Sequence, residues 1–324
     1  METSDLLRNI INLPIISSSL AEEMLSGNFR SIFKGQGMEF DEARHYQAGD
    51  DIRSIDWNAS ARFGHPFVKM YREERELTIL LLIDISPSMH GTARIPGENV
   101  ICHGENKQLL TPYEQALISS AIIAFSAEHT GQQVGAFLFD KDIEKVFPPR
   151  KGRKHIMSII MAALQYQNNT VSRRTHKGSN IASALIGARR LLKKRSLVVV
   201  ISDFFSINWE QEMGILCRKH DCLALKISSP QEVPYPGLIT MEDPETGVRI
   251  EAPAGLDSFK ESWATWHSER MVLWESQSKK SGAAFLDLST EDDAPAALIK
   301  FFGSRSHGRG HGHGYSQNKK RKKR

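Results

Sequence analysis

Residues 76 to about 303 alternate between short apolar runs and longer segments in which apolar residues recur every three or four positions. A short continuous apolar run is typical of a strand that is covered on both faces, and the longer periodic pattern is typical of an amphipathic helix. The two most apolar runs are ELTILLLID (residues 76–84) and SLVVVISDFF (residues 196–205). The repeated order of strand and helix predicts an α/β fold, an open, mostly parallel, Rossmann-like sheet with helices on both faces.

The segment TPYEQALISSAIIAFSAEH (residues 111–129) contains a strong signal for the start of a helix. Thr111 is suited to the N-cap, Pro112 to the first helical position, and Glu114 completes a capping box. Further along, GLITMEDPETGVRIEAP (residues 237–253) predicts a hairpin, because two alternating segments flank a turn rich in Pro and Gly.

Three tryptophans, Trp263, Trp266 and Trp274, fall in a predicted long helix at residues 256–281. Their successive spacings of three and eight residues place all three on one broad face of a helix. Such a face is typical of core packing rather than of a cofactor site, so we expect these side chains to be buried.

Oxygen-bearing side chains follow the two most apolar runs and precede one predicted helix. Asp84, Ser86 and Ser88 end the first run, Asp203 ends the second, and Ser179 stands just before a helix. Because the carboxyl ends of parallel strands meet at one edge of a sheet, we expect these elements to lie together. Each residue also has a simpler interpretation, since it can end a strand in a polar turn or cap the next helix.

Carboxylate and hydroxyl oxygens are hard ligands, which suit Mg²⁺ (or Mn²⁺) in octahedral geometry. The alternate spacing of Asp84, Ser86 and Ser88 points their side chains the same way from an extended or tightly looped backbone. With few carboxylates around it, a bound ion keeps enough positive charge to accept an acidic side chain from a partner. The pattern Asp-x-Ser-x-Ser is weak by itself, and only the additional positions raise its value.

The first 75 residues have a different character. The segment GQGMEFDEARHYQAGDDIRSIDWNASAR (residues 35–62) is dense in charges of both signs, and it predicts irregular structure with short strands. We favour a structural network of ion pairs and hydrogen bonds, because buried charges usually need such pairing. The alternative is a docking surface. The residues of this network are Glu39, Arg44, Asp50, Asp51, Arg53, Asp56, Trp57 and Arg62.

These motifs resemble known families. Residues 76–303 resemble a von Willebrand factor A domain, whose metal-ion-dependent adhesion site is matched by Asp84, Ser86, Ser88, Ser179 and Asp203. Where that site usually has threonine, this chain has Ser179, which keeps the hydroxyl. The segment at residues 35–62 resembles the signature of the DUF58 family, whose members are typically found beside MoxR-type AAA+ ATPases. The resemblance therefore implies three regions, with the signature in residues 1–75, the domain in 76–303 and a tail in 304–324.

The resemblance implies a non-catalytic protein-interaction module, which binds an acidic side chain of a partner through a Mg²⁺-dependent adhesion site. A MoxR-type AAA+ ATPase is the expected partner, in the assembly or maturation of a complex. One alternative is a metal-dependent phosphatase that forms a phosphoaspartate at Asp84, but Ser86 stands where such enzymes place a second acid. Another is polyanion binding through the basic tail. We expect no enzymatic activity and no specific binding of nucleic acid.

Composition and charge distinguish the body of the chain from its tail. The chain has 324 residues and a net charge of +4, but residues 301–324 contain eight Lys or Arg residues and no acid, so residues 1–300 carry a net charge of −4. The Gly/His/basic tail is predicted to be disordered. Three cysteines without zinc-like spacing, and the lack of a leader pattern or a long apolar run, predict a cytoplasmic protein with no membrane span.

Overall fold

The structure is a computed structural model, which describes residues 39–47, 50, 55–72, 77–90, 110–168, 178–229, 238–242 and 248–304. The chain divides into two compact units. One unit is Lys34–Glu76, and the other contains the described residues from Leu77 onward. The tail beyond residue 304 lies outside the described residues.

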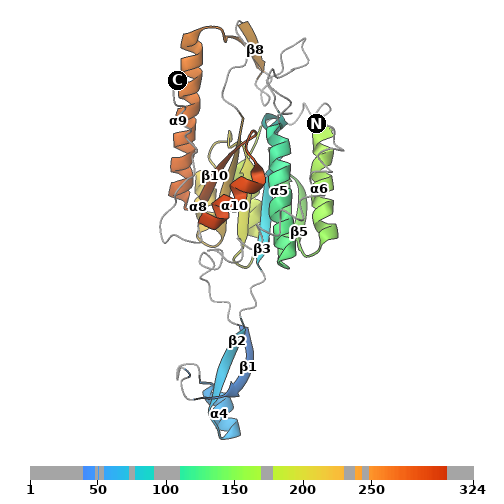
Figure 1. Cartoon of the computed structure of the whole chain (residues 1–324), viewed down its shortest axis with the longest axis vertical. Coiled ribbons are helices and arrows are strands. Elements are labelled where there is room, and N and C mark those ends of the chain that lie inside the picture. The colour runs from blue at the N-terminus through green and yellow to red at the C-terminus, as the bar shows by residue number, and fades with distance from the viewer. Residues whose placement is uncertain are drawn as a thin grey trace. The chain divides into compact units, whose positions relative to one another are not determined.

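The larger unit is built on one six-stranded sheet (Figure 1). Its strands lie in the order β10-β7-β6-β3-β4-β5, and all pairs are parallel except β4 with β5. The fold class predicted from the sequence is therefore confirmed. The strands are β3 (Thr78–Asp84), β4 (Gln133–Phe139), β5 (Ile143–Arg150), β6 (Leu197–Ser202), β7 (Asp221–Ser228) and β10 (Ala284–Ser289).

This strand order is that of a doubly wound sheet, and it reverses direction between β3 and β6. Ligands of such sheets bind outside the carboxyl ends of the strands at the point of reversal. Asp84 is the last residue of β3, and Asp203 directly follows β6. The topology therefore places the two predicted carboxylates on the two strands that flank the reversal.

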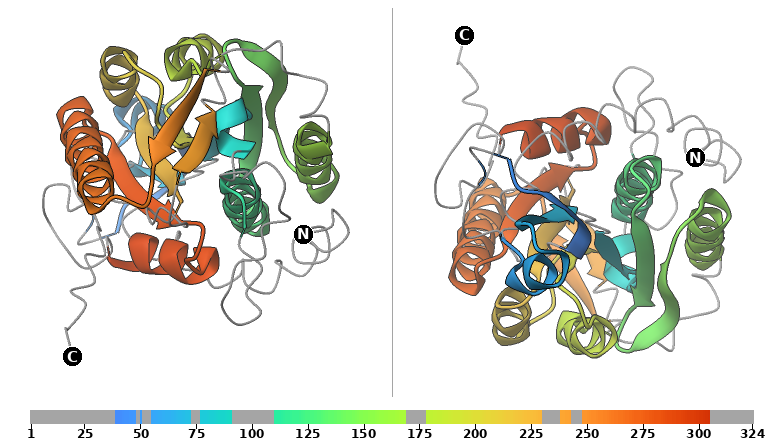
Figure 2. Two further views of the ribbon diagram at one scale, coloured as in Figure 1. Left: turned by 90° about the horizontal axis from the view of Figure 1, so that it is seen from above. Right: turned by 90° about the horizontal axis from the view of Figure 1, so that it is seen from below.

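Helices cover both faces of this sheet, as the two views along it show (Figure 2). The residues of β3 alternate between two hydrophobic cores: Ile79 and Leu81 pack with α5 and α6, whereas Leu80 and Leu82 pack with α7 and α8. Burial on both faces explains why this strand reads as one continuous apolar run. The helices of this unit are α5 (Pro112–His129), α6 (Arg153–Asn168), α7 (Ile181–Leu191), α8 (Glu210–Cys217), α9 (Asp257–Ser281), α10 (Ala294–Ser304) and the 3-10 helix η2 (Pro87–His90).

Two local predictions are confirmed. Helix α5 begins in a capping box, in which the Thr111 hydroxyl accepts a hydrogen bond from the Glu114 backbone and the Glu114 carboxylate accepts one from the Thr111 backbone. The predicted hairpin forms from the antiparallel strands β8 (Leu238–Glu242) and β9 (Arg249–Pro253). Its turn, residues 243–247, lies outside the described residues.

The prediction that three tryptophans of α9 are buried is wrong for Trp266. Trp274 is 4% exposed, but the side chain of Trp266 is 42% exposed and that of Trp263 is only partly buried. At 1.5 Å per residue the 25-residue helix is about 37 Å long, which exceeds the length of a six-residue strand. Its N-terminal half therefore extends past the end of the sheet (Figure 1), and neither Trp263 nor Trp266 belongs to a hydrophobic core of the described residues.

The smaller unit contains the antiparallel strands β1 (Glu39–His45) and β2 (Phe67–Arg72) and the short helix α4 (Trp57–Phe63). The predicted short strands are thus present, whereas helix α4 was not predicted. No helix in the described part of the chain combines the length and the apolar character needed to cross a membrane.

Candidate functional site

Asp84 stands at the centre of the candidate site. Strand β3 is buried along nearly its whole length and delivers this side chain to the carboxyl edge of the sheet, where it is fully buried. One carboxylate oxygen, Oδ1, accepts a hydrogen bond of 2.9 Å from the backbone N–H of Ser86. The other, Oδ2, faces hydroxyl groups from two different segments of the chain. A buried carboxylate is thus held by local and distant donors together.

Ser86 and Ser88 lie beside Asp84 and continue the cluster. The two hydroxyl oxygens are 3.0 Å apart, with Ser86 buried and Ser88 half-buried. The chain turns between them into η2, which begins at Pro87. The turn keeps both hydroxyls close to the carboxyl end of β3, as the alternate spacing predicted.

Ser179 joins the cluster from a distant part of the sequence. Its hydroxyl donates a hydrogen bond of 2.8 Å to Asp84 Oδ2. The simpler interpretation, in which Ser179 caps the following helix, is wrong, because the N-cap of α7 is Asn180 and the Asn180 side chain accepts from the Ser183 backbone. The Ser179 hydroxyl therefore points to the carboxylate and not to the helix.

Asp203 follows β6 and lies near enough to Asp84 for the two charges to repel each other. Its Oδ1 accepts a hydrogen bond of 3.0 Å from the Phe205 backbone. It does not cap the next helix, since the N-cap of α8 is Trp209. All five residues predicted as metal ligands are therefore gathered at the point where the strand order reverses.

Ser202 belongs to this cluster and was not predicted from the sequence. Its buried hydroxyl donates a hydrogen bond of 2.6 Å to Asp84 Oδ2 and accepts one of 3.0 Å from the Phe204 backbone. Strands β3 and β6 are direct neighbours in the sheet, which brings the end of β6 beside Asp84. The signal in the sequence was its position, immediately before Asp203 at the end of an apolar run.

Electrostatics at this site disfavour two ionised carboxylates. Burial, together with the negative charge of Asp203, raises the pKa of Asp84 to about 6, although hydrogen bonds from Ser202 and Ser86 act in the opposite direction. Ionised Asp84 is therefore costly in the protein alone, and a cation at this position would lower that cost. The donor set of two carboxylates and several hydroxyls fits a hard divalent ion such as Mg²⁺.

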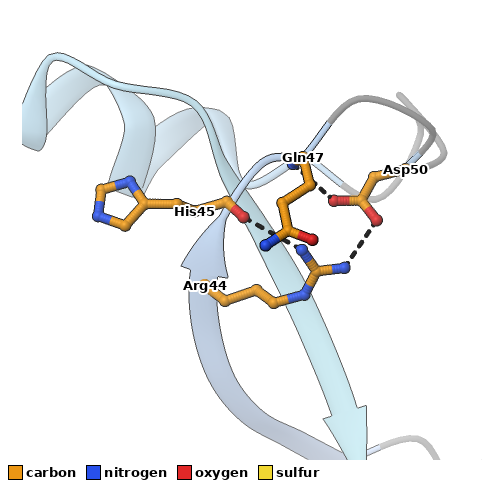
Figure 3. A network of polar contacts seen from close by, with 4 residues as sticks. All are labelled: Arg44, His45, Gln47 and Asp50. Carbon is orange, nitrogen blue, oxygen red and sulfur yellow. Dashed lines mark hydrogen bonds and ion pairs between the residues drawn. The ribbon is translucent and has the colours of Figure 1, made fainter.

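Residues 35–62, called the signature segment from here on, contain a separate polar network in the smaller unit (Figure 3). Arg44 donates to an Asp50 oxygen over 2.7 Å and to the His45 carbonyl over 3.2 Å, and the Gln47 backbone donates to the other Asp50 oxygen over 2.9 Å. These bonds, those from Arg44 first, hold the pKa of Asp50 below its usual range. The contacts are local and fix the turn after β1.

Three other residues of the predicted network, Asp56, Trp57 and Arg62, lie at or in helix α4. Asp56 caps α4, where one oxygen accepts from the Asn58 and Ala59 backbones over 3.0 and 3.2 Å. Trp57 opens that helix with 69% of its side chain exposed, and Arg62 lies exposed in its last turn. The remaining members, the side chain of Glu39 and residues Asp51 and Arg53, lie outside the described residues.

Comparison with known proteins identifies the family. Residues 42–271, more than half of the chain, match the family model described as protein of unknown function DUF58. This chain belongs to the DUF58 family. An uncharacterized protein of Mycobacterium tuberculosis is 30% identical over 294 residues, which cover 88% of this DUF58 protein and 85% of that one. An uncharacterized protein of Mycobacterium avium is 28% identical over 169 residues, or 50% of this chain and 94% of that protein.

Solved structures overlap the DUF58 protein only loosely. The crystal structure of the SpRpn10 VWA domain has 11% identity and a TM-score of 0.36, and covers 70% of this chain and 95% of that domain. Proximal thread matrix protein 1 from the mussel byssus has 18% identity and a TM-score of 0.31; the overlap covers 47% of this chain and 38% of that protein. The six-stranded sheet itself shows the fold of the larger unit.

A second carboxylate of this DUF58 protein, partly buried, lies on the outer part of the sheet. Asp287 of β10 is paired in register with Lys226 of β7. Burial is the main reason that the pKa of Asp287 rises to about 6, despite the Lys226 charge and a hydrogen bond from Ser228. Among the described residues its Oδ1 has no hydrogen-bond partner. The carboxylate is thus disfavoured in its ionised form.

Asp287→Asn should flatten the dependence of stability on pH. Because the folded protein keeps its Asp287 proton up to a higher pH than the unfolded chain, the wild-type protein loses stability as pH rises from about 4 to 6. The variant lacks this loss, so its stability relative to wild type should rise by up to about 3 kcal/mol between pH 4 and pH 7. Urea unfolding across this range measures the difference. Asp293→Asn, at an exposed position, is the control, and parallel curves for wild type and Asp287→Asn would contradict the prediction.

Proposed function

We propose that this DUF58 protein is a non-catalytic protein-interaction module that recognises an acidic side chain of a partner through a divalent cation held at the Asp84 cluster. The observation that carries the proposal is the convergence of two buried carboxylates and several hydroxyls at the reversal of the strand order. When bound, Mg²⁺ (or Mn²⁺) would supply a positive charge and open coordination positions. Asp84 would ligate it ionised, with Ser86, Ser88, Ser179 and Asp203 as the other ligands.

Each part of the cluster has a defined task in this proposal. Burial excludes water from Asp84, and the Ser86 backbone fixes the orientation of its carboxylate. The Ser202 hydroxyl donates a hydrogen bond to the same carboxylate and accepts one from the Phe204 backbone. Ser202 therefore orients the Asp84 carboxylate from the end of strand β6. Ser179 reaches the Asp84 carboxylate from the loop before α7 and adds a further hydroxyl oxygen to the cluster. A carboxylate of the partner would complete the coordination of the cation.

The proposed partner is a MoxR-type AAA+ ATPase in the cytoplasm, and the proposed task is the assembly or maturation of a complex. The resemblance to the DUF58 family supports this partner, and the acidic side chain follows from the charge of a bound cation. The alternative of a phosphatase is less well supported. Ser86 contacts the hydroxyl of Ser88 where a second acid would be required, so we expect no hydrolysis of p-nitrophenyl phosphate.

Affinity capture from native lysate tests this function. The tagged full-length protein is used as bait in Mg²⁺ and, in a parallel experiment, in EDTA, and the bound proteins are identified by mass spectrometry. The expected result is an AAA+ ATPase that is recovered in Mg²⁺ and lost in EDTA. Equal recovery in both conditions would contradict the metal-dependent mechanism and shift the docking role to the signature segment.

A further inference from the structure

A row of aromatic side chains extends from the Asp84 cluster along the N-terminal half of α9. Phe205, two residues after Asp203, stacks on Trp266 with ring centroids 6.3 Å apart. Trp266 stacks in turn on Trp263 at 5.7 Å, and Trp263 on Phe259 at 6.0 Å. Phe205 and Trp266 are each 42% exposed. We call Phe205, Trp266, Trp263, Phe259 and the neighbouring Arg270 the aromatic ladder.

Arg270 gives the aromatic ladder a charged end beside the candidate site. Its guanidinium carbon lies 4.4 Å from the centroid of the Phe205 ring and 5.0 Å from that of Trp266. Both rings thus hold the cation by cation–π contacts, which restrict its orientation. No ion pair joins Arg270 to a described carboxylate, and the planar fork of a guanidinium suits bidentate pairing with one.

The local charge favours an anionic ligand. Lys226 and Arg270 both lower the pKa of His267, after burial as the main cause, so the surroundings of the aromatic ladder are positive. Asp287 acts on Lys226, and Asp203 acts on both Lys226 and Arg270. Asp203 is itself one of the proposed metal ligands. Once Asp203 is engaged with a divalent ion, the charge of Arg270 would be available to a second carboxylate.

The loop that presents Phe205 has an unusual backbone. Phe204 has a φ of 56° and Asn208 a φ of 61°, and a bulky residue rarely adopts such a conformation. The buried Phe204 ring compensates by packing on Trp209 and Trp274, with centroids 5.2 and 5.7 Å away. This backbone conformation at Phe204 buries the Phe204 ring and turns the Phe205 ring outward. The packing of Phe204 in the core therefore holds the exposed Phe205 ring in place.

We propose that the aromatic ladder is the second half of the docking surface and binds a partner segment with two carboxylates, one for the cation at Asp84 and one for Arg270. The proposal rests on the proposed function and deepens it. Trp, Phe and Arg are enriched at the energetic centres of protein interfaces, where rigid rings supply apolar contact. Phe205 and Trp266, the two rings that Arg270 contacts, would pack on the apolar residue between the two acidic residues. Trp263 and Phe259 continue the row and would contact the segment beyond them.

The geometry sets the spacing of the two carboxylates. The step from Asp203 to Phe205 is two residues, or at most about 7 Å, and Arg270 lies directly over the Phe205 ring. An extended partner segment advances about 3.3 Å per residue. Its two acidic residues should therefore be separated by about two to four positions, with an aromatic or aliphatic residue between them.

Peptide selection followed by a mutant cycle tests the inference. A phage-displayed library of random dodecapeptides is panned against the full-length protein in Mg²⁺, and enriched peptides are synthesised and measured by fluorescence anisotropy. We expect acidic pairs at this spacing. Arg270→Gln should weaken their binding at least about tenfold, and Trp266→Ala should do the same. Lys279→Gln, which removes a cation from the last turn of α9, should bind like wild type.

The pairing of Arg270 with one carboxylate is resolved by the cycle. In one peptide variant, the acidic residue assigned to Arg270 is changed to its amide. This change should weaken binding to the wild-type protein, but it should not further weaken binding to the Arg270→Gln protein. Equal affinities of Arg270→Gln and wild type, or enrichment of peptides without acidic pairs, would overturn the inference. EDTA gives the separate test of the proposed function: unchanged binding in EDTA would refute the metal requirement while the cycle still reports on Arg270.

Discussion

Asp84→Ala is expected to abolish Mg²⁺-dependent binding of the partner while the domain stays folded. Asp84 is the residue to which Ser179, Ser202 and the Ser86 backbone all point, so its removal takes away the shared centre of the cluster. Isothermal titration with Mg²⁺ should show at least a tenfold loss of metal affinity, because losing even a residue that only supports a metal ligand commonly costs about 10- to 100-fold. Far-ultraviolet circular dichroism reports whether the fold persists.

The isosteric variant Asp84→Asn separates the loss of charge from the loss of shape. Its amide oxygen can still accept hydrogen bonds, whereas its charge is gone. Burial and Asp203 raise the pKa of Asp84 above its unfolded value, so ionised Asp84 lowers stability as pH rises through about 4 to 6. In EDTA at pH 8 the variant should therefore be at least as stable as wild type. In Mg²⁺ wild type should gain melting temperature and Asp84→Asn should not.

Asp287→Asn is the matched control for this experiment. It removes another carboxylate of the same sheet, at the fourth position of β10 and outside the cluster. The pKa of this carboxyl is also raised to about 6. The control should keep the full Mg²⁺-dependent rise in melting temperature. A folded Asp84→Asn protein that keeps this rise, or that still binds the partner only in Mg²⁺, would refute Asp84 as a metal ligand.

Much of this fold could be predicted because its central strands β3 and β6 are buried on both faces. Each residue of β3 from Ile79 to Ile83 packs against a helix on one side or the other, and such burial leaves an uninterrupted apolar run in the sequence. The start of α5 was equally clear, since Thr111 and Glu114 act on each other within one turn. Signals of this kind are local, and the topology then places Asp84 near Asp203.

The parts that escaped prediction depend on contacts between distant segments. Ser202 looks like any polar residue at the end of a strand, and only the pairing of β6 with β3 directs its hydroxyl to Asp84. The periodicity of the sequence placed Trp266 on the inner face of α9. It could not show that helix α9 extends beyond the end of the sheet at this position. The positive φ of Phe204, which turns Phe205 outward, has no signature in a phenylalanine.

The signature segment likewise has contacts that could be predicted from the sequence and contacts that could not. Its density of charges was evident, and the contact between Arg44 and Asp50 spans only six positions. The role of Asp56 was less evident, because its side chain caps a helix that was not predicted. Charged residues at turns can form pairs or caps, and the sequence does not distinguish the two until the helix boundary is known.

Trp209→Ala is expected to cause the largest loss of stability among these variants. Trp209 is 1% exposed and is the largest fully buried side chain of the described residues. Replacing a buried tryptophan by alanine removes apolar contacts and leaves a cavity, which together cost about 3–5 kcal/mol. Guanidinium unfolding monitored by circular dichroism measures the change. The exposed Trp266→Ala is the control and should change the free energy of unfolding by less than about 1 kcal/mol.

The same variant should weaken the response to Mg²⁺, which links the core to the site. Trp209 packs against the ring of Phe204, whose backbone N–H holds the Ser202 hydroxyl behind Asp84. A cavity at Trp209 removes the packing that offsets the positive φ of Phe204, so the loop that contains Asp203 should lose its fixed geometry. Metal affinity should therefore fall at temperatures where the variant is still folded. Unchanged affinity in a destabilised protein would show that the site is held by the strands alone.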